Sequence, residues 1–248
     1  MMKKISLAAM LLCVLGGSAA AQDSAPAATA AGTDAAQVQS IQVKGARERL
    51  VPYMESYALA KKVKEASNGR VAFGLRLIPA TPETTLDNLQ LWLGEGENAT
   101  PVPVGEGGLF VVPINDSVAA EKGHYSINRK KGELKVRVAL LPNVPRDAWT
   151  IGLMQQVVQD GQAAVKTMLP WYMRAFGIGV DAVAVCSPNA GMPVQVMNGD
   201  EVAATFTTDK KATNDIGRPV FCKHFVAADH LDASYKVVVP EGAEVLML

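Results

Sequence analysis

The sequence has no net charge and has few aromatic, cysteine and histidine residues. Its 248 residues include 24 Lys plus Arg and 24 Asp plus Glu, so the formal net charge is zero. This balance excludes the strongly basic proteins that neutralise nucleic-acid phosphates, so we expect no nucleic-acid partner. It also excludes acidic disordered proteins. Aromatic residues make up 6% of the chain and hydrophobic residues 49%, which predicts a sizeable, mainly aliphatic core.

Long apolar runs are also missing after the N-terminus. Lys3 and Lys4 precede an apolar run over residues 5–15, which the small residues 18–21 follow. This is the pattern of a secretory signal peptide, and we expect residues 1–21 to be removed after Ala21. The apolar run is about 11 residues long and therefore too short to span a bilayer. No later run reaches that length, so we expect no transmembrane segment in the mature chain.

Two other interpretations of the N-terminus remain open. The segment would be an uncleaved anchor if the cleavage region were not used. A lipoprotein would be acylated at Cys13, but Leu11 and Leu12 stand where a small residue is expected. The two lysines and the alanine-rich cleavage region resemble those of bacterial exported proteins, which implies a periplasmic location.

Signal cleavage would leave two cysteines, Cys186 and Cys222. An even pair in an oxidising compartment predicts a disulfide. The alternative is a metal site formed by Cys222, His224 and His230, because thiolate and imidazole are natural ligands of zinc and copper. Their spacing matches no structural zinc motif, and the compartment favours the disulfide, so we expect no metal or other cofactor.

The remaining chain alternates helical and strand patterns. Residues 22–40 are rich in Ala, Ser, Thr and Gly and predict a disordered leader. Apolar spacing of three and four residues predicts helices over 52–67 and 147–169, the second capped by Asp147. Each helix precedes a β-block, which divides the chain into 41–145 and 146–248; the two parts could also form one continuous domain. This order predicts an α+β fold with sandwich-like antiparallel sheets.

The strand patterns have a period of two residues and are separated by polar turns. In the first block, Leu134, Val136, Val138 and Leu140 illustrate the expected buried side of a strand, and residues 128–132 are expected at a hairpin tip before it. Strands are predicted at 71–77, 89–93, 109–112, 133–141, 178–186, 194–197, 202–207, 219–225, 235–239 and 245–248.

A strand pattern, a Pro-Val-Pro-Val element, a glycine-rich turn and a Leu-Phe strand follow one another over residues 89–113. This segment resembles the carboxypeptidase-regulatory-like and transthyretin-like β-sandwich modules of exported bacterial proteins. It departs from them at Gly105-Glu106, where the modules prefer Asp before the turn glycine. The resemblance implies a binding or structural role. The whole chain also resembles uncharacterised exported families of proteobacteria, which supply no activity.

Catalytic patterns are weak. Residues 229–232 place Asp229 and Asp232 around His230, which would serve general acid–base chemistry if a cleft surrounded them. A polar loop explains the same residues. Ser187 or Cys186 as a nucleophile would need a base and an oxyanion hole, and the sequence has no nucleophile-elbow motif. A hydrolase of an unrecognised family therefore stays an alternative, and the protein is not expected to be an enzyme.

The densest aromatic stretch is residues 171–176. Trp171, Tyr172 and Arg174 are candidates for a ligand or partner surface because aromatic residues and Arg are enriched at interfaces, although core packing is the favoured explanation of this stretch. Arg146 is, like Arg174, a candidate anchor for an anion. These observations favour a non-catalytic periplasmic protein that binds a partner, an envelope component or a small ligand. The oligomeric state stays open.

Overall fold

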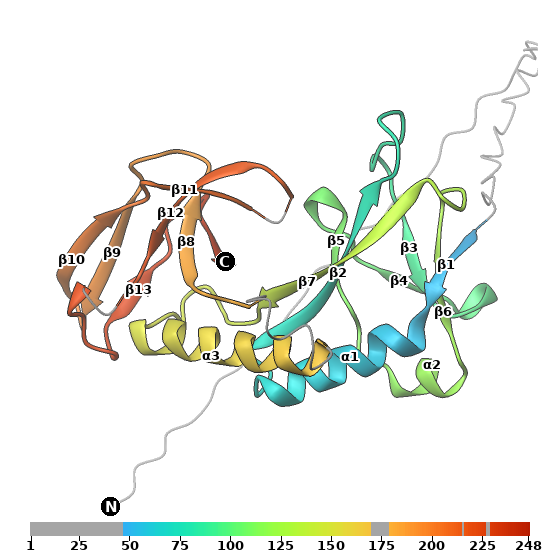
Figure 1. Ribbon diagram of the computed structural model, residues 1–248, viewed down its shortest axis with the longest axis horizontal. Coiled ribbons are helices and arrows are strands. Elements are labelled where there is room, and N and C mark those ends of the chain that lie inside the picture. Colours follow the sequence, from blue (N-terminus) through green and yellow to red (C-terminus); the bar gives the residue numbers. More distant parts are fainter. Residues whose placement is uncertain (1–46, 170–178, 215, 227–228) are drawn as a thin grey trace, which may run out of the picture. The chain divides into compact units, whose positions relative to one another are not determined.

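Helices and blocks of antiparallel strands alternate in the computed structural model, which describes residues 47–169, 179–214, 216–226 and 229–248 (Figure 1). Within these residues the chain forms three α-helices and fourteen β-strands, and the strands make four antiparallel sheets. The arrangement is sandwich-like and confirms the predicted α+β class. All the described residues belong to one compact unit.

The first main helix forms where the sequence predicts it. Helix α1 spans Tyr53–Ala66 and follows Pro52, whose backbone is extended with ψ 138°. Proline suits this position because the first helical N–H groups have no intrahelical partner. Asn68 and Gly69 both take positive φ angles just after the helix and end it, close to the predicted end at residue 67.

The second main helix, α3, spans Ile151–Met168. Its N-cap is Thr150, whose Oγ1 accepts a hydrogen bond from the Leu153 backbone N–H at 3.1 Å. The prediction that Asp147 caps this helix was therefore wrong, because a threonine nearer the apolar run occupies the cap. A third helix, α2 (Asp116–Ala120), was not predicted; it has only five residues and is capped by Asn115.

The first β-block makes two sheets. In the four-stranded sheet the order is β1-β6-β3-β4, and in the three-stranded sheet it is β5-β2-β7, so the long strand β2 lies between two edge strands. The strands are β1 (Glu48–Pro52), β2 (Val71–Pro79), β3 (Leu91–Leu93), β4 (Thr100–Val102), β5 (Leu109–Val111), β6 (His124–Ile127) and β7 (Leu134–Pro142).

The second β-block also makes two sheets, with the orders β10-β9-β13 and β11-β12-β8-β14. They meet through an edge-to-face contact between Phe206 and Phe225, whose ring centroids lie 5.7 Å apart. The strands are β8 (Val183–Ser187), β9 (Pro193–Asn198), β10 (Glu201–Thr207), β11 (Lys210–Thr213), β12 (Pro219–His224), β13 (Lys236–Val238) and β14 (Glu244–Met247).

The hairpin predicted around residues 128–132 does not form. Strand β6 pairs with β1 and β3, whereas β7 pairs with β2 in another sheet. The Asn128 side chain accepts a hydrogen bond from Gln90 N at 2.9 Å and donates one to Asn88 O at 2.8 Å. These bonds hold the start of the connection against the β3 side, so the chain changes sheets here instead of folding back.

Burial in the β2–β7 pair differs from the predicted alternation. Val136 and Val138 were expected inside, but their exposed fractions are 37% and 51%. Arg76 alternates with the apolar residues of β2, yet it is only 4% exposed. The reason is position: β7 is an edge strand of its sheet, whereas β2 is covered on both faces.

One hydrophobic core joins the two β-blocks and includes Leu77 of β2, Val157 of α3 and Val196 of β9. Helices α1 and α3 pack against each other along this core (Figure 1). Arg70, just after α1, donates from Nε to Oδ2 of Asp160 on α3 at 2.6 Å, which fixes the two helices further. The first and second blocks are therefore held in contact, and side chains from both can line one site.

Candidate binding cavity

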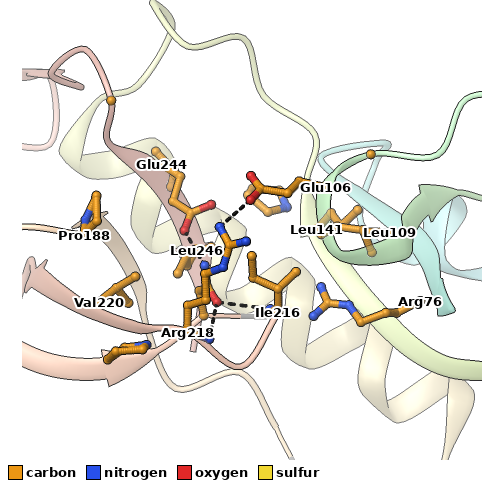
Figure 2. A pocket seen from close by; sticks show the side chains of 16 residues that line it. Arg76, Glu106, Leu109, Leu141, Pro188, Ile216, Arg218, Val220, Glu244 and Leu246 are labelled. Carbon is orange, nitrogen blue, oxygen red and sulfur yellow. Dashed lines mark hydrogen bonds and ion pairs between the residues drawn. The ribbon is translucent and has the colours of Figure 1, made fainter. Parts of the chain in front are cut away.

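A cavity of about 590 Å³ lies where β2, β5 and β7 face β14 and the turn between β11 and β12 (Figure 2). Its size falls in the range of small-molecule sites. Residues from both β-blocks line it, which explains why no local sequence motif revealed it. The lining side chains used below are Arg76, Glu106, Leu109, Leu141, Ile216, Arg218, Val220, Glu244 and Leu246.

Two glycines shape the wall of the cavity contributed by the first block. Gly107 and Gly108 lie in a short 3-10 helix, η2 (Glu106–Gly108), with φ angles of 64° and 78°. A Cβ on Gly108 would lie 2.3 Å from the Leu77 backbone O, and one on Gly107 would lie 1.9 Å from Ile216 Cγ2. Glycine therefore allows η2 to rest on β2 and Ile216 to rest on η2. The turn predicted at this glycine run is confirmed.

The opposite wall is ordered by Asn214. Its Oδ1 accepts hydrogen bonds from the backbone N–H groups of Ile216 at 3.1 Å and Arg218 at 3.0 Å. Its Nδ2 donates to Glu244 Oε1 on β14 at 3.2 Å. One amide side chain thus fixes the turn before β12 and ties it to β14, an edge strand of the same sheet, which positions Ile216 and Arg218 at the cavity.

Opposite charges meet across the cavity. The Arg218 guanidinium forms an ion pair with the Glu106 carboxylate, which joins the two β-blocks (Figure 2). The two side chains are 65% and 70% exposed, so solvent can reach both. Glu244 adds a second carboxylate, and Arg76 contributes a buried guanidinium from β2. The polar part of the cavity therefore offers sites for both an anionic and a cationic group.

The rest of the lining is aliphatic and comes from both blocks, with Leu109 and Leu141 on one side and Val220 and Leu246 on the other. Val220 and Leu246 are at most 7% exposed and belong to a small hydrophobic cluster. An apolar group that entered the cavity would find side chains already held in place.

The predicted disulfide is present. Cys186 on β8 and Cys222 on β12 are directly paired residues of neighbouring strands, and their Sγ atoms are bonded. Both residues are fully buried. The bond removes Cys186 as a nucleophile. Ser187, the other nucleophile considered, is also buried, and its Oγ accepts a hydrogen bond from Asn189 N at 3.0 Å.

The predicted metal ligands are not brought together in the part of the chain that the structure describes. There, no group of three His, Cys, Asp or Glu residues is arranged to hold a metal ion. The Sγ of Cys222 belongs to the disulfide. Nδ1 of His224 lies 3.5 Å from Lys210 Nζ, and its Nε2 is buried. His230 lies in a loop with φ 50°.

His224 leads to a prediction about pH. Burial lowers its pKa, and the charges of Lys210 and Lys223 lower it further. Because the folded-state pKa lies below the ordinary value of about 6.5, the unfolded chain binds more protons as pH falls below that value. The stabilising effect of neutral His224 is therefore complete above about pH 6.5 and is lost on acidification. We expect the melting temperature to fall between pH 7.5 and 5.5, and His224→Gln to reduce this fall. An equal fall in both proteins would contradict the prediction.

The acid–base candidates of residues 229–232 serve local structure. Asp229 Oδ1 accepts from Lys223 Nζ at 2.9 Å, and the Asp232 carboxylate accepts from the N–H and the hydroxyl of Ser234. Burial would raise the pKa of Asp229, but the hydrogen bonds from Val226 N and Lys223 lower it overall. The bonds to Ser234 lower the pKa of Asp232. These carboxylates are therefore held ionised in a loop.

The other sequence candidates are placed as follows. Trp171, Tyr172 and Arg174 lie outside the described residues. The Arg146 guanidinium donates to backbone carbonyls, including Ala243 O at 2.9 Å, and so holds the chain after β13. Arg218, Glu106 and Glu244 were not singled out from the sequence. The glycine run next to Glu106 was the one signal, since it predicted a turn at this place.

Comparisons with known proteins do not assign the chain to a family. No family model, no curated protein and no solved structure matches the chain. Among the described helices, none is both long and apolar enough to cross a membrane. The fold is thus α+β, and both β-blocks line its cavity, which has an ion pair at its edge and aliphatic side chains elsewhere. The function is inferred below from this cavity.

Proposed function

We propose that this protein is an exported, non-catalytic binding protein that takes a small zwitterionic ligand with an apolar side chain, such as a short peptide. The observation that carries this proposal is the Arg218–Glu106 ion pair at the edge of an aliphatic cavity. A ligand with both an ammonium and a carboxylate group can satisfy both partners at once. Its apolar part would lie against Leu109 and Leu246.

The energetics support exchange of partners at this ion pair. A solvent-exposed ion pair contributes only about 0–1 kcal/mol to stability. Arg218 and Glu106 can therefore turn from each other to a ligand at small cost. A guanidinium can bind a carboxylate through two parallel hydrogen bonds, which gives the ligand one orientation. Glu106 and Glu244 then remain to accept hydrogen bonds from the ligand ammonium group.

The cavity chemistry supports binding over catalysis. The described residues that line it include no His, Cys, Ser or Lys, so a positioned nucleophile with its own base is not present among them. The two glutamates that line it have partners, Arg218 for Glu106 and Asn214 for Glu244. This set of groups suits recognition of charge and shape.

Export is part of the proposal. The signal pattern of residues 1–21 and its cleavage after Ala21 imply a periplasmic location, and the Cys186–Cys222 disulfide supports an oxidising compartment. Intact-mass measurement of the protein recovered from the periplasm should give a chain that begins at Gln22 with the disulfide closed. A chain that retains Met1 in the cytoplasm would contradict export.

Ligand binding is testable with leucine-containing di- and tripeptides in isothermal titration of the chain from Gln22. Free peptides should bind, and the same peptides with acetylated N-termini and amidated C-termini should not, because both charges are removed. Arg218→Gln and Glu106→Gln should each weaken binding about tenfold or more, since a hydrogen bond to a charged group contributes about 1.5–3 kcal/mol.

A matched control is available in the Arg49–Glu95 ion pair. It is exposed to a similar degree, 74% and 64%, but neither residue lines the cavity. Arg49→Gln should therefore leave the affinity unchanged. Equal binding of free and blocked peptides, or equal effects of Arg218→Gln and Arg49→Gln, would refute the zwitterion model.

A further inference from the structure

A second surface of the protein adjoins the cavity: the outer edge of strand β7, whose last residues, Leu141 and Pro142, line the cavity. This strand pairs with β2 along all nine of its residues, in a register without interruption. On its other side, no strand of the described chain pairs with it, since the sheet order is β5-β2-β7. An edge strand of this length presents a row of backbone N–H and C=O groups on which another strand can form.

The hydrogen bonds at both ends of the pair show which backbone groups face outward. Asn143 N donates to Arg70 O at 2.8 Å, and Ala80 N donates to Glu133 O at 2.8 Å. In an antiparallel ladder such hydrogen-bonded pairs alternate with pairs that do not bond. Lys135, Arg137 and Ala139 therefore bond to β2, and the N–H and C=O groups of Val136 and Val138 point away from it.

The side chains of the edge separate by charge. Val136 and Val138 lie on one face of the sheet and are 37% and 51% exposed. Lys135 and Arg137 lie on the other face and are also exposed. Carboxylates at the matching positions of an added strand would face these two exposed cations, and opposite charges on paired strands are favourable.

We propose that the outer edge of β7, over Lys135–Ala139, binds an extended segment of a partner protein in which acidic residues alternate with apolar ones. The segment adds a fourth strand to the β5-β2-β7 sheet. Its backbone pairs with the outward groups of Val136 and Val138, its carboxylates face Lys135 and Arg137, and its apolar side chains cover the two valines. Strand addition of this kind obtains affinity from main-chain hydrogen bonds and specificity from alternate side chains.

Charge also selects among possible occupants. Basic residues on an edge strand protect it from non-specific pairing. A second copy of β7 would bring Lys135 and Arg137 close to the same two residues of its neighbour, and this repulsion opposes self-association. An acidic strand meets no such repulsion. Lys135 and Arg137 therefore oppose the pairing of basic strands with β7 and favour the pairing of an acidic strand.

The experiment uses the full mature chain and a fluorescent heptapeptide of alternating glutamate and valine, with binding read by fluorescence polarisation. A heptapeptide with the same composition but with its valines and glutamates in two separate blocks has equal charge and cannot present alternate faces. A heptapeptide of alternating lysine and valine tests the sign of the charge. The alternating acidic peptide should bind at least about tenfold more tightly than either control.

A pair of proline variants tests backbone pairing. Val138→Pro removes an outward N–H but no bond to β2, and proline is tolerated at such edge positions. Val111→Pro is the matched control: Val111 is also 51% exposed and lies on the opposite edge of the same sheet. Its neighbour Val112 donates to Phe73 O at 3.0 Å, so the Val111 N–H also points outward. Val138→Pro should weaken binding at least about tenfold, and Val111→Pro should not.

Two further measurements keep the proposal open to refutation if a proline variant fails to fold. The peptide methylated at alternate backbone nitrogens should lose binding to the wild-type protein in one of its two methylation patterns and retain it in the other. The double variant Lys135→Glu, Arg137→Glu should prefer the lysine–valine peptide. Equal binding of the alternating and block peptides, insensitivity to both methylation patterns, or dimerisation of the wild-type chain through β7 would overturn the proposal.

Discussion

Replacement of Cys186 and Cys222 together by alanine is expected to lower the free energy of unfolding by about 4 kcal/mol. The two residues are separated by 36 positions, and the crosslink removes the closure entropy of that loop from the unfolded chain. Both side chains are fully buried beside Ala184, Val220 and Leu246, so lost packing adds to the effect. Urea unfolding followed by circular dichroism measures the change.

The single variants provide an internal check. Cys186→Ala and Cys222→Ala should each cost nearly as much as the double variant, because either change removes the same bond. The reductant dithiothreitol should lower the unfolding midpoint of the wild-type protein and leave that of the double variant unchanged. A double variant with the wild-type midpoint would show that the crosslink does not stabilise the fold.

The two long helices and most strands were predictable because their signals are local. The apolar spacing of α3 lies within that helix, and Asn68 and Gly69, which end α1, follow it directly. The disulfide was predictable by counting, since two cysteines remain after residue 21. Helix α2 was missed because its five residues make little more than one helical turn, which is too short for a recurring apolar pattern. Its cap, Asn115, is a local signal that could have found it.

Burial of individual strand residues was not predictable, because it depends on neighbours that are distant in sequence. Val138 and Leu75 are paired residues with the same apolar pattern, yet Val138 is exposed and Leu75 is buried. The difference is that β7 is an edge strand and β2 is central. The position of a strand in its sheet follows from the whole topology, which periodicity does not contain.

The cavity was hidden for the same reason. The residues of its central ion pair, Glu106 and Arg218, are 112 positions apart. Each of them is an ordinary charged residue near a turn when the sequence is considered locally. The glycine run at 105–108 predicted a turn correctly, but the side chain that rests on it, Ile216, belongs to the other β-block. A binding site assembled from two blocks needs the tertiary contacts before its members can be recognised.

The approach of η2 to β2 gives the second large prediction. Gly108→Ala is expected to lower the free energy of unfolding by about 3 kcal/mol. About 1 kcal/mol comes from the positive φ of 78°, which alanine adopts poorly. The rest comes from the contact of the new Cβ with Leu77 O at 2.3 Å, which only a backbone shift can relieve, with a cost of about 1–3 kcal/mol.

Gly132→Ala separates these two causes. Gly132 has a φ of 90°, but a Cβ there would meet nothing within 4 Å, so only the conformational cost of about 1 kcal/mol applies. Urea unfolding of the two variants should therefore differ by about 2 kcal/mol. Gly108→Ala should also weaken peptide binding, because a shift of η2 moves Glu106 away from Arg218, whereas Gly132→Ala should not. If Gly108→Ala destabilised the fold but left binding intact, η2 would support β2 without positioning the ligand. The ligand ammonium group would then be bound by Glu244, the other glutamate among the described residues that line the cavity.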